Sequence, residues 1–166
     1  MTALLTELKI RARLQVNARR RDLAPLGQDT QQDPAPRLRD CLIRVARDVG
    51  FSHWDHARRV LGGLAGSDDD MGSFWHAPGC QTLLNQWCTT HEQAQQLQRA
   101  DPGSFVLPYR RQFMLVQDDF IRELALDPAD PAWAESKRDL VQAYATPAWS
   151  ALAMQRLRAP RTTFSR

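Results

Sequence analysis

The chain has 166 residues, 43% of them hydrophobic, which is enough to bury the core of one domain without a metal or a disulfide framework. No stretch approaches the roughly 18 uninterrupted apolar residues of a membrane helix, and apolar residues precede the basic ones at the start, unlike a secretory signal. We therefore expect a cytoplasmic protein without a membrane segment.

Positive charge gathers in the first part of the chain. Residues 1–62 hold 12 Lys and Arg against 7 Asp and Glu, a net charge of +5, whereas residues 63–166 hold 10 against 12, a net charge of −2. The three cysteines, Cys41, Cys80 and Cys88, are odd in number and show no repeated spacing. This pattern indicates free thiols in a reducing compartment.

A first helix is expected over residues 2–20, where an apolar residue recurs every three or four positions. It runs into three consecutive arginines, Arg19 to Arg21. Residues 24–36 follow with three prolines and no periodicity, so they are predicted to form a loop.

Two short helices are predicted next, over residues 36–49 and residues 52–61, with Gly50 between them. Glycine is favoured just past a helix end because it adopts backbone conformations that other residues avoid. Ser52 is expected to cap the second helix, with Asp55 three residues later completing the capping pattern.

Residues from about 37 to 61, which include RLRDCLIRVARDVGFSHWDHA, resemble a short helical module of bacterial glyoxalase-related and uncharacterised proteins. Those modules also join a V-A-R-x-x-G-F turn to a helix that contains a tryptophan. The resemblance implies a bacterial protein with a helical unit. It does not carry glyoxalase activity to this chain, since the paired metal-binding βαβββ repeats of that enzyme fold are not visible in the sequence.

The same two helices resemble a helix-turn-helix, whose second helix enters the major groove of DNA. Here that helix would present His53 and His56, but Asp55 would face phosphate, and its first turn lacks the residues that usually read base edges. Specific DNA reading, general contact with nucleic acid or another anion, and a plain packing unit remain alternatives. The candidate anion-binding residues are Arg13, Arg19, Arg20, Arg21, Arg58 and Arg59. A GC-rich genome also yields many arginines without selection for binding.

The acidic run at residues 68–70 is predicted to be an exposed connection, because the alternating ligands of an EF-hand are absent. An irregular aromatic segment follows at residues 74–80, and a fourth helix is predicted over about 81–99. Within the aromatic segment, Cys80 is a candidate nucleophile, since a helix start stabilises a thiolate, and His76 is a candidate base. A core thiol is the alternative interpretation of Cys80.

Two histidines and two cysteines fall within 16 residues, in the order His76, Cys80, Cys88 and His91. If residues 81–99 form one helix, the cysteines lie about 12 Å apart along its axis. Two thiolates on one zinc ion lie roughly 4 Å apart. We therefore expect no metal ion and no other cofactor, and Cys88 is predicted to be a core thiol.

Two short apolar runs of strand type predict at most one small β-hairpin, near residues 105–116. The segment between them, residues 109–112, combines a tyrosine with two arginines and is a candidate anion-binding ledge. Ion pairs with Asp118 or Asp119 are the alternative for these arginines.

Helical signals return from Gln117. Asp130 and Thr146 are capping residues, and each is followed by a proline that suits the first helical position, so helices are predicted to begin at both. The tail after Pro160 is expected to be frayed.

Taken together, these patterns predict a mainly α protein, a compact domain of about six or seven helices. A basic N-terminal helical region, residues 1–62, is expected to pack with a C-terminal helical region, residues 63–160, leaving a tail at residues 161–166. We predict a small bacterial binding or regulatory protein that contacts nucleic acid or an acidic protein through its arginine-rich N-terminal helices. The alternatives are a small enzyme with Cys80 and His76 in its site, and a homo-oligomer formed through the tryptophan-rich C-terminal helices.

Overall fold

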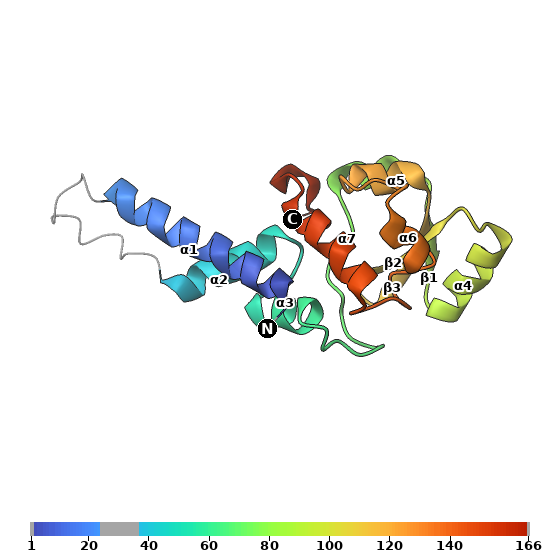
Figure 1. Cartoon of the computed structure of the whole chain (residues 1–166), viewed down its shortest axis with the longest axis horizontal. Coiled ribbons are helices and arrows are strands. Elements are labelled where there is room, and N and C mark those ends of the chain that lie inside the picture. Colours follow the sequence, from blue (N-terminus) through green and yellow to red (C-terminus); the bar gives the residue numbers. More distant parts are fainter. Residues whose placement is uncertain (1, 24–36, 166) are drawn as a thin grey trace.

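The structure is a computed structural model that describes residues 2–23 and 37–165 (Figure 1). This part of the chain contains seven α-helices and one small three-stranded antiparallel sheet, which confirms the predicted mainly α class. None of its helices is long and apolar enough to cross a membrane. The predicted loop at residues 24–36 lies outside the described residues.

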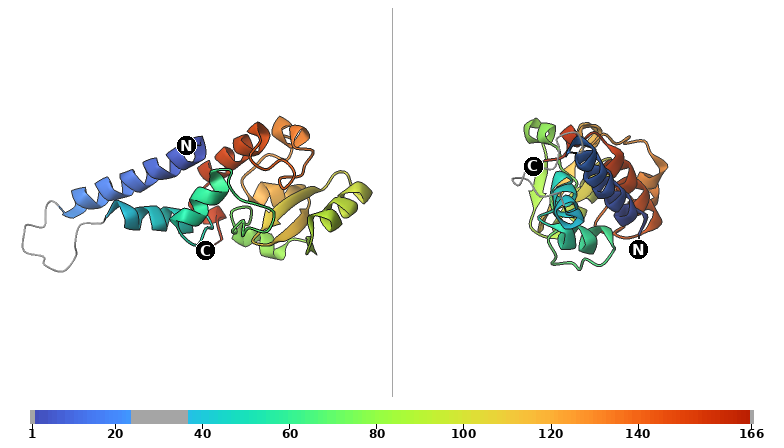
Figure 2. Two further views of the ribbon diagram at one scale, coloured as in Figure 1. Left: turned by 90° about the horizontal axis from the view of Figure 1, so that it is seen from below. Right: turned by 90° about the vertical axis from the view of Figure 1, so that its left-hand side faces the viewer.

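Helices α1 (Ala3–Leu23) and α2 (Leu38–Asp48) run side by side and extend away from the rest of the molecule (Figures 1 and 2). We call these two helices the arm. Leu8 and Ala12 of α1 are fully buried, as the predicted apolar stripe requires, and Cys41 and Val45 of α2 are buried as well. The arm is therefore a two-helix unit with one shared apolar seam.

Helix α3 (Trp54–Leu61) follows α2 after a short turn, as predicted, but its cap differs. The ring Nδ1 of His53 accepts a hydrogen bond from the backbone N–H of His56 at 3.1 Å, so His53 is the capping residue. The prediction for Ser52 was wrong. Its hydroxyl lies instead 2.9 Å from Nδ1 of His56, which places it at the site described below.

The sheet has the strand order β1-β3-β2. Strands β2 (Phe105–Tyr109) and β3 (Gln112–Val116) form the predicted hairpin, with Leu107 opposite Met114. Strand β1 (Gln86–Cys88) adds a third strand on the other edge of β3, with Trp87 opposite Met114. The sheet is thus larger than the single hairpin that was predicted.

The predicted helix over residues 81–99 was wrong. The chain forms a 3-10 turn, η2 (Pro78–Thr82), then β1, and only then helix α4 (His91–Ala100). Thr90 starts α4, because its hydroxyl accepts a hydrogen bond from the N–H of Gln93 at 3.2 Å. Leu84, inside the range of the predicted helix, is 94% exposed and lies just before β1.

Three helices complete the fold: α5 (Asp118–Glu123), α6 (Pro131–Glu135) and α7 (Pro147–Arg158). The predicted caps of α6 and α7 are confirmed. Asp130 Oδ1 accepts from the N–H of Ala132 at 2.8 Å, and Thr146 Oγ1 accepts from the N–H of Trp149 at 3.3 Å. Helix α7 lies between the arm and the sheet (Figure 1).

The main apolar core is continuous across the predicted boundary at residue 62, running from Leu4 in α1 to Leu157 in α7. Trp133 and Trp149 lie inside this core, so these two tryptophans offer no surface for oligomerisation. The predicted fraying after Pro160 was wrong, because residues 161–163 form a 3-10 turn, η3 (Arg161–Thr163), and Phe164 is buried.

Candidate functional site

The arm carries the excess positive charge of the molecule. Residues 2–23 and 37–49 hold 10 Lys and Arg against 4 Asp and Glu, a net charge of +6. Residues 50–165 hold 11 against 13, a net charge of −2. The fold therefore separates a basic arm from a weakly acidic body, which the sequence alone described only as a basic first third.

The predicted anion-binding arginines of α1 are exposed on this arm. Arg13, Arg19, Arg20 and Arg21 all face solvent. Within residues 2–23 and 37–165, none of the four belongs to an ion pair. Arg19 to Arg21 lie near the outer end of α1, toward the end of the arm that points away from the body (Figure 1). Their charge is available to a ligand.

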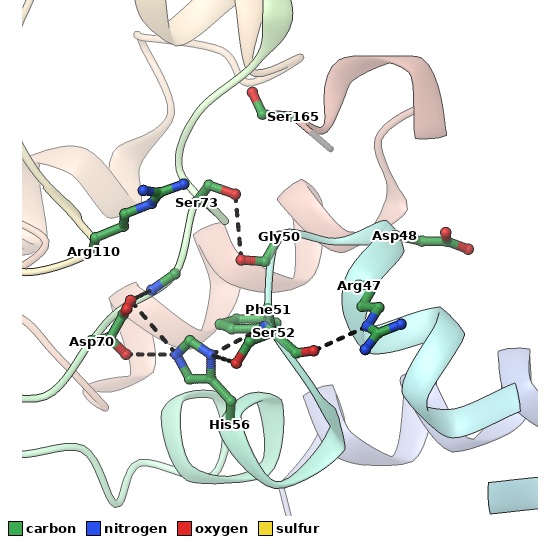
Figure 3. A pocket seen from close by; sticks show the side chains of 11 residues that line it. Arg47, Asp48, Gly50, Phe51, Ser52, His56, Asp70, Ser73, Arg110 and Ser165 are labelled. Carbon is green, nitrogen blue, oxygen red and sulfur yellow. Dashed lines mark hydrogen bonds and ion pairs between the residues drawn. The ribbon is translucent and has the colours of Figure 1, made fainter. Parts of the chain in front are cut away.

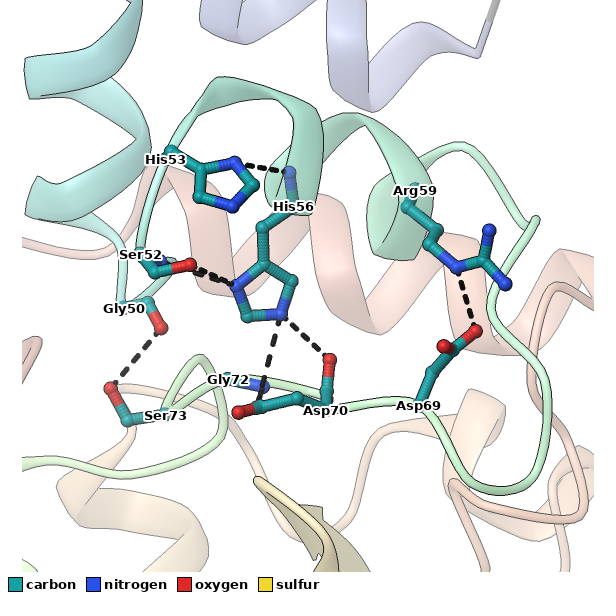
Figure 4. Close-up of polar contacts among 9 residues, drawn as sticks. All are labelled: Gly50, Ser52, His53, His56, Arg59, Asp69, Asp70, Gly72 and Ser73. Atoms are coloured by element: carbon teal, nitrogen blue, oxygen red, sulfur yellow. Dashed lines mark hydrogen bonds and ion pairs between the residues drawn. The ribbon is translucent and has the colours of Figure 1, made fainter.

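The two candidate arginines of α3 are engaged within the protein. Arg58 pairs with Asp55 at 3.2 Å, and Arg59 pairs with Asp69 at 2.7 Å. The hydrogen bond from the N–H of Gly66 and the bond from Arg59 hold the pKa of Asp69 below its ordinary value. The acidic loop thus lies against α3 and opposes the entry of this helix into a DNA groove (Figure 4).

A polar pocket of about 660 Å³ lies where the arm meets the body (Figure 3). We call it the root pocket. It is formed by the end of α2, the turn before α3, the loop at residues 70–73, the β2–β3 turn and the C-terminal tail. Its lining includes Arg47, Gly50, Ser52, His56, Asp70 and Arg110.

Two glycines let the backbone segments of the root pocket cross closely. Gly50 and Gly72 have φ angles of +93° and +68°, and a Cβ on Gly72 would lie 2.6 Å from the carbonyl oxygen of Gly50. The N–H of Ser73 donates to that same oxygen at 2.9 Å. The N–H of Arg110 donates to the Gly72 oxygen at 2.8 Å, which ties the hairpin turn to this loop.

His56 connects α3 to the same loop (Figure 4). Its Nδ1 accepts from the N–H of Ser52 at 3.2 Å, so the ring hydrogen is on Nε2, which donates to the backbone oxygen of Asp70 at 2.7 Å. The Ser52 hydroxyl therefore donates to Nδ1. The Asp70 carboxylate stays 3.8 Å from Nε2, so the group that orients this ring is a backbone carbonyl, and a full Ser-His-Asp triad is not formed.

The arginines of the root pocket retain unused donors. Arg47 donates through Nε to the backbone oxygen of Ser52 at 3.1 Å, and the Arg110 guanidinium lies 5.4 Å from the centre of the Tyr109 ring. Neither arginine is in an ion pair with any residue that the structure describes. The alternative predicted for Arg110 and Arg111, an ion pair with Asp118 or Asp119, is not found among the described residues. Asp118 pairs with Arg122 instead.

The enzyme alternative finds little support at Cys80. This residue is fully buried, and burial raises the pKa of its thiol to about 11, so the thiolate is scarce at neutral pH. His76 directs its Nδ1 to the hydroxyl of Ser165 at 2.8 Å. Burial, and to a lesser degree the charge of Arg156, lower the pKa of His76. These are properties of core residues.

The four residues weighed as zinc ligands are held in separate surroundings. Cys80 belongs to the main core, whereas Cys88 packs in a second, smaller cluster beside α4. His91 binds the buried carboxylate of Asp139 at 2.8 Å through Nε2. Across the part of the chain that the structure describes, no three His, Cys, Asp or Glu side chains converge as a metal site requires.

Sequence reasoning missed Arg156. This fully buried side chain on α7 donates to the backbone oxygens of Phe74, His76 and Leu124. It thereby holds the aromatic segment in place. The sequence contained no signal for this role, because Arg156 and the exposed Arg158 both look like ordinary basic residues in the last turn of a helix.

No known protein family, curated protein or solved structure matches this chain. The likeness of residues 37–61 to the glyoxalase-related module therefore stays a prediction. The arm and the root pocket are the two candidate sites of the molecule.

Proposed function

We propose that this chain is a small cytoplasmic bacterial binding protein whose arm contacts nucleic acid through the phosphate backbone. The observation that carries the proposal is the set of exposed arginines on α1 that have no ion pair within the described residues. A helix of this length spans about 30 Å, so its basic side chains can contact several successive phosphates. Arginine also binds phosphate through two parallel hydrogen bonds.

The binding we propose does not depend on base sequence. The acidic loop beside α3 opposes major-groove reading, whereas the arm offers positive charge without an organised set of base-reading side chains. Contacts of this kind supply affinity and strong salt dependence but little discrimination among sequences. An acidic protein offers a similar charge pattern and is the competing ligand.

Fluorescence anisotropy tests the proposal. A labelled DNA duplex, a labelled single strand and polyglutamate are titrated with the protein between about 50 and 200 mM salt, the range in which phosphate contacts are strongly screened. The test variant carries Arg19→Gln, Arg20→Gln and Arg21→Gln. The control carries Arg99→Gln, Arg122→Gln and Arg158→Gln, which removes the same charge from exposed positions on the body.

We expect nucleic acid to bind more tightly than polyglutamate and the affinity to fall steeply with salt. For a duplex, the slope of log affinity against log salt should shrink by roughly 0.9 for each phosphate contact that the arm variant loses. Equal loss in the two variants, or binding that salt does not weaken, would overturn the proposal. Preference for polyglutamate would assign the arm to an acidic protein.

A further inference from the structure

Two arginines line the root pocket, one on each side of the Gly50–Ser52 segment (Figure 3). Arg47 comes from the last turn of α2, and Arg110 comes from the turn between β2 and β3 (Figure 3). Arg47 donates a hydrogen bond from Nε to the backbone oxygen of Ser52, and the terminal nitrogens of both arginines have no carboxylate partner among the described residues. Both arginines thus keep charge-assisted donors with which a ligand of the pocket can form hydrogen bonds.

The carboxylates of the same pocket are already engaged. Asp70 Oδ1 accepts from the N–H of Gly72 at 2.7 Å, and Asp48 lies 3.9 Å from Arg161. The Gly72 N–H is neutral, so Asp70 keeps its negative charge, whereas Asp48 is balanced by Arg161. Arg47, Arg110 and Arg161 against Asp48 and Asp70 leave a net charge of +1 at the pocket.

The hydroxyls of the pocket favour a ligand that carries hydroxyl groups of its own. Ser52 donates its hydrogen to His56, and Ser73 donates its hydrogen to the oxygen of Gly50 at 3.3 Å. Both oxygens are then left as acceptors. They suit the hydroxyl groups of a ligand, while the arginines suit its anionic group.

The backbone at Arg110 supports a role in binding. Arg110 has a φ of +52° at the first position of the two-residue turn between Tyr109 and Gln112, where glycine is favoured. Its N–H and its C=O both bond to the loop at residues 71–72, each at 2.8 Å. The strained turn is thus held in place, and it presents an arginine to the pocket.

We propose that the root pocket binds a small phosphate ester that also carries hydroxyl groups, of the class of sugar phosphates and nucleotides. Arg47 and Arg110 supply the positive charge that attracts its phosphate, and its hydroxyls donate to Ser52 and Ser73. The volume of about 660 Å³ is in the range of sites that hold ligands of this size. This site is separate from the arginines near the outer end of the arm and stands whether or not the arm binds nucleic acid.

Isothermal titration calorimetry tests the site with inorganic phosphate, ribose 5-phosphate and AMP, and with ribose and adenosine as probes that lack phosphate. Two single variants remove one cation each, Arg47→Gln and Arg110→Gln. Arg44→Gln is the matched control, since Arg44 is exposed on the same helix as Arg47 and does not line the pocket. Thermal melts establish that each variant is folded.

We expect the two phosphate esters to bind more tightly than inorganic phosphate, and ribose and adenosine to bind at least tenfold more weakly than the esters, consistent with the loss of charge-assisted hydrogen bonds. Each pocket variant should weaken ester binding by roughly tenfold or more, whereas Arg44→Gln should stay within about twofold of wild type. Absence of saturable binding by both esters would overturn the site, as would equal losses in Arg44→Gln and the pocket variants.

The triple variant of Arg19 to Arg21 separates this site from the arm. It should retain the wild-type affinity for ribose 5-phosphate and AMP. If it loses small-ligand binding while Arg110→Gln keeps it, the esters bind only at the arm, and the root pocket is not a ligand site. Failure of nucleic-acid binding with intact ester binding would remove the proposed function alone.

Discussion

The guanidinium carbon of Arg156 lies 3.9 Å from the centroid of the Phe164 ring, so the C-terminal tail covers a fully buried positive charge. This side chain donates five hydrogen bonds. Three reach the backbone oxygens of Phe74, His76 and Leu124, and two reach Thr163. Burial lowers the pKa of Arg156 to about 9, so the cation still predominates at neutral pH.

Replacement of Arg156 by methionine should destabilise the protein by about 3 kcal/mol or more, because several buried carbonyl oxygens lose their donor. Urea unfolding followed by tryptophan fluorescence measures the change. Arg158→Met, two residues later and exposed, is the control and should shift the free energy of unfolding by less than about 0.5 kcal/mol. Similar unfolding midpoints in both variants would show that Arg156 does not hold the tail and the aromatic segment together.

The sequence correctly predicted those elements that depend on residues only a few positions apart. Asp130 and Thr146 cap their helices as expected, since a capping residue acts on an N–H only two or three positions away. Strand β1 was missed because its formation depends on pairing with β3, more than 20 residues later. This tertiary pairing excludes the single helix that was predicted over residues 81–99.

The two candidate sites also differ in whether residues close in sequence reveal them. The exposed arginines of α1 were found from composition and helical spacing, because a solvated helix face needs no tertiary partner. The root pocket was not found, since its residues are brought together by the backbone crossing at Gly50 and Gly72 and by the hairpin turn at Arg110. Of these features, the sequence analysis singled out only Gly50, as a helix end, and residues 109–112, as a separate anion-binding ledge.

The thiols provide a direct check on the enzyme alternative. Cys41, Cys80 and Cys88 are all buried, and burial raises the pKa of Cys80 to about 11. We expect iodoacetamide at neutral pH to label none of them appreciably in the folded protein and all three in urea, as peptide mapping by mass spectrometry would show. Fast labelling of Cys80 alone in the folded protein would restore it as a nucleophile.

His76 should make stability depend on pH. Burial lowers its pKa in the folded protein below the ordinary value of 6.5, so the unfolded chain binds more protons between these two values. The contribution of neutral His76 to stability is therefore complete above pH 6.5 and declines as the pH falls toward the folded-state pKa. Urea titrations between pH 7.5 and pH 5 should show this loss in the wild type and a smaller one in His76→Gln. A pH dependence that is identical in the wild type and His76→Gln would mean that protonation of His76 is not linked to unfolding.

Arg110→Gly should separate stability from binding. Glycine adopts the φ of +52° at this position without steric strain, and the side chain that it removes is exposed. We expect a free energy of unfolding that is unchanged or higher by up to about 1 kcal/mol, together with a loss of AMP binding by roughly tenfold or more. Thermal unfolding and calorimetry on one preparation measure both quantities. If Arg110→Gly lowers stability while keeping AMP affinity, the arginine serves the turn itself and the root pocket loses one of its two cations.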